Sequence, residues 1–95
     1  MQFYERNRNL STLYERNKHA ILGTLTKEST PAPKKASVMI SISKVCAVSS
    51  AILDDMRASA SPEEELLEAE RVHRAWQDLL VLAWETNMLR KTDAA

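Results

Sequence analysis

The sequence predicts an all-α protein, and three observations lead to this fold class. The 95-residue chain contains a single glycine, its β-branched residues cluster in one stretch, and its C-terminal third has the pattern of one long amphipathic helix. Its length suits one folded unit, since domains of about 100–150 residues are typical. We therefore expect a short N-terminal helix followed by an antiparallel helical hairpin of two longer helices, assembled as a dimeric helical bundle.

The first 23 residues are expected to form a basic helical segment. Thr12 and Glu15 have the spacing of a capping box, and Gly23 is placed to end a helix. These signals predict a helix from about Leu13 to Leu22, while residues 2–11 either extend it or fray.

The same segment contains a near-repeat, in which residues 3–9 are echoed by residues 13–19. On a helix, a shift of ten residues leaves the two copies about 80° apart around the axis. We therefore expect equivalent positions of the two copies to lie on different faces.

Residues 24–36 are predicted to be a polar linker. Pro31 and Pro33 remove helical hydrogen bonds, and each proline pushes the preceding residue toward an extended conformation. Such a segment is expected to be solvated.

Residues 37–59 carry a mixed signal. Val38, Ile40 and Ile42 alternate with more polar residues, which taken alone predicts a strand. A heptad-like face runs through the whole window and consists of Val38, Ile42, Val45, Ser49, Ile52 and Met56. Helix is favoured by the length of this face and by the lack of a second candidate strand. A short turn would then join it to the C-terminal helix, so that residues 37–95 form the helical hairpin.

The C-terminal helix is predicted from Ser61 to Lys91. Ser61 and Glu64 form a capping box, and Pro62 suits the first helical position. The predicted buried stripe is Ala69, Val72, Trp76, Leu79 and Ala83. A second strip beside it consists of Leu66, Leu80, Trp84 and Met88. Residues 79–84 are apolar all round, a pattern that favours enclosure.

The size of the chain indicates that this helix is not fully covered. A compact chain of this length has a radius of gyration near 12 Å, whereas a helix of about 30 residues is roughly 45 Å long. One alternative is that the helix bends over a monomeric three-helix core. We expect instead a second protein surface, as a two-fold homodimer or a different partner. The predicted partner-binding residues are Leu80, Trp84, Met88 and Leu89, with Val45 and Ile52 opposite. Trp76 is assigned to the core.

The charge distribution suggests a nucleic-acid alternative. Residues 1–44 carry eight Lys/Arg against three Glu, and residues 45–95 carry five against ten Asp/Glu. The predicted basic patch consists of Arg6, Arg8, Arg16, Lys18, Lys34 and Lys35. Basic residues interleaved with Tyr4 and Tyr14 could follow a phosphate backbone. Glu5 and Glu15 dilute the patch, however, and the pI is near neutral.

Catalytic and metal chemistry have little support in the sequence, so we expect no catalytic residues, no metal and no cofactor. His19, Cys46 and His73 lie in three different segments, and one glycine cannot make a phosphate-binding loop. Glu70 and His73 have the spacing of half a carboxylate-bridged metal site, but a solvated Glu–His pair is the simpler interpretation.

The expected location is the cytoplasm. A lone cysteine excludes an internal disulfide and fits a reducing compartment. We find no signal-peptide pattern and expect no apolar stretch approaching the roughly 18–20 residues of a membrane span. The predicted function is a small non-enzymatic adaptor or inhibitor that binds a larger protein through an apolar helical surface. The alternative is a small nucleic-acid-binding or transcription-regulatory protein.

Overall fold

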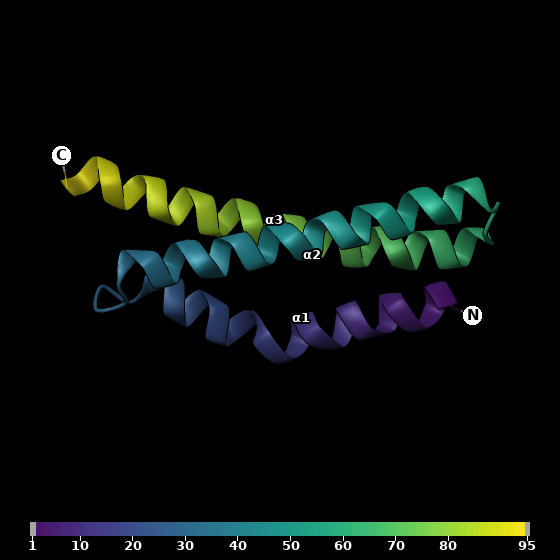
Figure 1. Cartoon of the computed structure of the whole chain (residues 1–95), viewed down its shortest axis with the longest axis horizontal. Coiled ribbons are helices and arrows are strands. Elements are labelled where there is room, and N and C mark those ends of the chain that lie inside the picture. Colours follow the sequence, from purple (N-terminus) through teal and green to yellow (C-terminus); the bar gives the residue numbers. More distant parts are fainter. Residues whose placement is uncertain (1, 95) are drawn as a thin grey trace.

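The protein is a bundle of three helices, as the sequence predicts for its fold class. The structure, a computed structural model, describes the backbone of residues 2–94 and the side chains of residues 3–86. Its helices are α1 (Gln2–Thr26), α2 (Ala32–Ala58) and α3 (Glu63–Ala94), with no strand in the described part of the chain. In Figure 1, α1 and α3 run in the same direction, and α2 runs in the opposite direction from the end of α1 to the start of α3.

The bundle is elongated. It measures 49 × 22 × 18 Å, with a radius of gyration of 15.2 Å, well above the value of about 12 Å for a compact chain of this length. The cause is α3, whose 32 residues form one helix without a break. The described backbone of α3 therefore runs the length of the bundle as a single helix.

Helix α1 is longer than the predicted helix of residues 13–22. It spans 25 residues and continues through Gly23, whose carbonyl accepts a hydrogen bond of 3.1 Å from the Lys27 N–H. Gly23 does not adopt the positive φ of a helix-ending glycine, so the predicted cap is wrong. The helix continues past Gly23 because this continuation buries the side chain of Leu25 completely.

The connection between α1 and α2 comprises residues 27–31 and is shorter than the predicted linker of residues 24–36. Pro31 is the residue before the first turn of α2, and its carbonyl accepts hydrogen bonds from the N–H groups of Lys34 and Lys35. Pro33 lies in that first turn, where a helix needs no backbone N–H. The two prolines therefore mark the start of α2 and do not interrupt it.

Residues 59–62 turn the chain from α2 into α3. The N–H of Ser61 bonds to the carbonyl of Met56 at 3.0 Å, and the N–H of Ala60 bonds to that of Arg57 at 3.2 Å. This pair of bonds is a Schellman motif, in which Ala60 has a φ of 52°. The carbonyl of Pro62 accepts the first hydrogen bond of α3, from the N–H of Leu66. The helix therefore begins at Glu63, one residue after the predicted first helical position.

The core lies along the faces that the sequence patterns predict. The α3 stripe of Ala69, Val72, Trp76, Leu79 and Ala83 is buried in full. On α2, the heptad-like face is buried at Ile42, Ser49, Ile52 and Met56 and half-buried at Val38 and Val45. The alternation that suggested a strand is therefore overridden by the helical face, as expected.

The near-repeat in α1 places its two copies on different faces, as predicted. Tyr4 is 58% exposed, whereas the equivalent Tyr14 is half-buried and packs edge-on against Trp76 with ring centroids 5.6 Å apart.

Helix α2 overturns one expectation. It is long and apolar enough to cross a membrane by length and composition, since an 18-residue window within it has a mean hydropathy of 1.8. Lys44 is the one charged residue between positions 36 and 53, where serines and alanines separate the aliphatic residues. A buried core helix passes the same test. Yet only 22% of this window is buried within the bundle, so α2 keeps a large uncovered surface.

Candidate functional site: an apolar groove between α2 and α3

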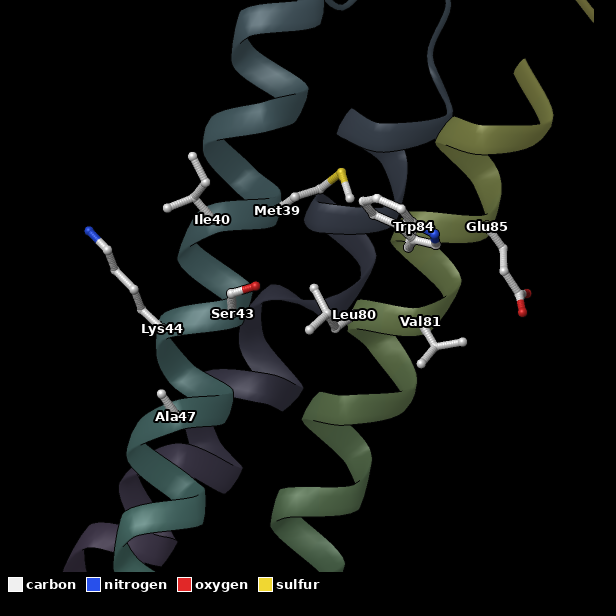
Figure 2. Close-up of a pocket in the computed structure, with 9 residues that line it drawn as sticks. All are labelled: Met39, Ile40, Ser43, Lys44, Ala47, Leu80, Val81, Trp84 and Glu85. Carbon is white, nitrogen blue, oxygen red and sulfur yellow. The ribbon is translucent and has the colours of Figure 1, made fainter. Parts of the chain in front are cut away.

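A groove of about 690 Å³ lies between α2 and α3 (Figure 2). Five of its lining residues come from α2: Met39, Ile40, Ser43, Lys44 and Ala47. The other four come from α3: Leu80, Val81, Trp84 and Glu85. We call this feature the α2/α3 groove.

Helical spacing explains why these residues share a surface. On each helix they recur at intervals of three and four residues, so they form a strip along one side of it. The core stripe of α3, which includes Leu79 and Ala83, points into the bundle. Leu80 and Trp84 each follow a core residue by one position, about 100° around the helix, and Val81 follows Leu79 by two positions, about 200°. They therefore turn toward the side that the core does not use.

The α2/α3 groove is apolar and open. Ile40 is 56% exposed, Val81 53% and Trp84 59%, while Met39 and Leu80 are half-buried between the helices. Large exposed apolar side chains are common when they are scattered, but a contiguous group of them marks an interaction surface. Tryptophan is also among the residues in which interface energy concentrates.

The two charged residues of the groove stand on opposite edges. In Figure 2, Lys44 leaves α2 on its outer side and Glu85 leaves α3 on the other, with the apolar residues between them. Both side chains are exposed, and no ion pair within residues 3–86 includes either of them. The groove is thus bordered by one cation and one anion.

The predicted partner-binding residues are distributed unevenly. Leu80 and Trp84 line the groove. Val45 is half-buried and lines a smaller cavity of about 240 Å³ between α1 and α2. Ile52 is 2% exposed and packs in the core, so it belongs to the interior and not to the predicted partner surface. Met88 and Leu89 lie outside the described side chains.

The sequence interpretation missed the α2 side of the groove. Sequence patterns alone place Ile40 in a strand-like alternation and Val81 in a segment that is apolar all round. Ile40, Lys44 and Ala47 follow the same four-and-three spacing as the core face, shifted around the helix. That second strip was a usable signal, but the stronger heptad-like face masked it.

The predicted basic patch does not form one surface. On α1, the positions of Arg6, Arg8, Arg16 and Lys18 point in four directions about 80° apart. Lys18 is also paired with Glu15 at 3.0 Å. Lys34 lies at the start of α2, and Lys35 is only 8% exposed. A nucleic-acid backbone needs a continuous cationic track, which these residues do not provide.

The Glu70–His73 pair expected from the sequence is also different in the structure. Nδ1 of His73 contacts the Ser49 hydroxyl, which in turn donates to the Cys46 carbonyl at 3.0 Å. Glu70 accepts instead from Arg57 at 3.3 Å. No group of three or more potential ligand side chains gathers among the described residues.

Cys46 is half-buried beside the core, and partial burial raises the pKa of its thiol. Less of the reactive thiolate therefore exists at neutral pH, which favours a packing role for Cys46 over a reactive one.

Comparison with known proteins adds no family to this description, since no family model, no curated protein and no solved structure matches the chain.

Proposed function

We propose that this protein is a small non-enzymatic adaptor or inhibitor that docks on a larger protein through the α2/α3 groove. The observation that carries the proposal is Trp84, a tryptophan left 59% exposed in the lining of an apolar groove between two long helices. Covering a large apolar side chain contributes about 1.5–3 kcal/mol, so the exposed groove favours a protein partner.

The shape of the groove supports a helical or extended segment as the bound element. Its residues occupy successive turns of two neighbouring helices, and an amphipathic helix can place its own apolar face along such a surface. The bound partner would alter activity or assembly by covering or holding that segment. Association of two copies through α2 and α3 belongs to the same proposal.

A nucleic-acid-binding function receives less support. The basic residues of α1 surround the helix, and the α2/α3 groove contains one lysine opposed by one glutamate. Neither arrangement gathers the cationic surface that phosphate binding requires.

Site-specific photo-crosslinking in the native host tests the proposal. Benzoylphenylalanine replaces Ile40 in the groove or, as the matched control, Leu67 outside it, because these residues are 56% and 58% exposed. We expect position 40 to capture a discrete product well above twice the chain mass of 10.7 kDa. This product should be absent from position 67 and should be lost when Trp84→Ala is added. Equal capture at both positions, or no product of that size, would contradict the proposal.

A further inference from the structure

We infer that in the free protein a second copy of this chain covers the α2/α3 groove, with α2 of each copy lying on α3 of the other. The inference rests on the proposed function in that it concerns the same surface. It names the occupant of that surface before any larger partner arrives.

The charges of the two helices favour this occupant and this arrangement. Helix α2 carries four Lys/Arg against two Asp, whereas α3 carries eight Asp/Glu against four Lys/Arg. Two copies can meet face to face in two simple ways. Rotation about an axis parallel to the helices places α2 on the partner's α3, so that opposite charges meet. Rotation about an axis across the helices places α2 on α2 and α3 on α3, so that like charges meet.

The edge residues of the groove follow the same symmetry. Rotation about the parallel axis exchanges the two edges, so Lys44 of one copy comes to the edge that holds Glu85 of the other. Side chains on helices lean toward the helix N-terminus, and α2 and α3 run in opposite directions. Lys44 therefore rises from its helix and Glu85 descends from its own, so that the two side chains span the same stretch of the groove (Figure 2). A two-fold dimer repeats this contact and forms two equivalent ion pairs.

The same rotation also brings apolar residues of one copy onto apolar residues of the other. Figure 2 shows Ile40 and Trp84 at one level of the groove, and Val81 lower, between the levels of Ser43 and Ala47. After rotation, Trp84 lies over the partner's Ile40, and Val81 lies between the partner's Ser43 and Ala47. There a branched side chain meets two small ones, and the two helices can approach closely.

A standard interface needs about 800 Å² from each partner, and even the narrower long side of the molecule measures 49 by 18 Å. The four helices α2, α3 and their copies would form an antiparallel four-helix core. Helix α1 would then lie outside this core on each copy. A larger partner would have to displace the second copy, so self-association would regulate access to the groove.

Charge exchange between positions 44 and 85 tests the arrangement, with sedimentation equilibrium of the full chain as the measurement. We expect wild-type protein to approach twice 10.7 kDa at micromolar to submillimolar concentration. Lys44→Glu alone and Glu85→Lys alone place like charges in contact twice, and each should raise the dimer dissociation constant at least about tenfold. The double variant restores opposite charges between copies and should return the constant close to that of wild type.

Two further variants keep the result interpretable. Trp84→Ala should raise the dissociation constant by about a hundredfold, whereas Leu67→Ala, equally exposed but outside the groove, should leave it unchanged. Circular dichroism checks that every variant remains helical.

Several results would overturn the inference. One is a wild-type monomer over the whole concentration range. Another is a dimer for which the double charge exchange gives no recovery, because that result would indicate α2 on α2. Binding of monomeric protein to phosphatidylcholine vesicles through Trp84 would assign the groove to a lipid surface. A monomer that still gives the large crosslink at position 40 would leave the proposed function intact while removing the second copy.

Discussion

The indole N–H of Trp76 donates a hydrogen bond of 3.1 Å to the backbone carbonyl of Leu10, and this bond joins α3 to α1. Trp76 is 2% exposed, and the edge of the neighbouring Tyr14 ring meets it at an interplanar angle of 76°. The second tryptophan, Trp84, lies two turns further along the same helix and is 59% exposed. The two indoles therefore have separate roles, one in the interior of the bundle and one on its open surface.

Replacement of Trp76 should weaken the fold. Trp76→Phe removes the hydrogen bond to Leu10 and leaves unfilled volume beside Tyr14, so we expect the free energy of unfolding to fall by about 2 kcal/mol. Urea denaturation followed by circular dichroism measures it. The matched control is Trp84→Phe, measured at a concentration where the protein is monomeric, which should change stability by less than about 0.5 kcal/mol. Equal losses for the two variants would contradict the assignment of Trp76 to the core.

Gly23 offers a stabilising substitution. It lies inside α1 with an ordinary helical φ, and a Cβ built there meets no atom within 4 Å. Glycine in a helix interior is less favourable than alanine by about 0.5–1 kcal/mol, because its unfolded backbone has more freedom to lose. We therefore expect Gly23→Ala to raise the free energy of unfolding by about that amount in thermal or urea denaturation. A loss of stability would show that the chain needs a special conformation at this position.

At Ala60 the reverse substitution, alanine to glycine, should stabilise the protein. Ala60 holds a φ of 52° in the turn between α2 and α3, a conformation that a Cβ disfavours by about 1–2 kcal/mol. Ala60→Gly removes this strain but adds freedom to the unfolded chain. The net expectation is a gain of about 0.5–1 kcal/mol. The neighbouring Ala58, which lies within α2, is the control, because Ala58→Gly should destabilise the protein instead.

The Glu68–Arg71 pair predicts a small dependence of stability on pH. The guanidinium group of Arg71 donates to both carboxylate oxygens, at 2.6 and 3.0 Å, and this hydrogen bonding lowers the pKa of Glu68. Because the folded pKa lies below the unfolded one, the stabilisation is present above the unfolded pKa. It is lost as the pH falls through the folded pKa.

Glu68→Gln isolates this effect. Both side chains are about half exposed, at 52% and 57%, so solvent screening limits the pair to about 0.5 kcal/mol at neutral pH. We expect Glu68→Gln to be less stable than wild type by that amount at neutral pH and equally stable near about pH 2. Urea denaturation at the two pH values measures the difference. A difference that persists in acid would show that packing, not charge, is responsible.

Much of the fold could be predicted because helical periodicity is a local property. The stripe from Ala69 to Ala83 and the heptad-like face from Val38 to Met56 are fixed by residue spacing alone, and the structure buries all of the first and most of the second. Helix ends were less predictable, since Gly23 and Pro33 each suit more than one position. Burial of Leu25 and the tolerance of a first helical turn for proline decided these cases.

The candidate site shows where sequence reasoning ends. The sequence by itself determined that the chain is helical, which residues share a face, and that its apolar residues exceed one such face per helix. Only the tertiary structure decided that Ile52 is enclosed while Ile40, also on α2, is open. Spacing assigns a residue to a side of its own helix, but packing against the other two helices decides whether that side meets protein or solvent.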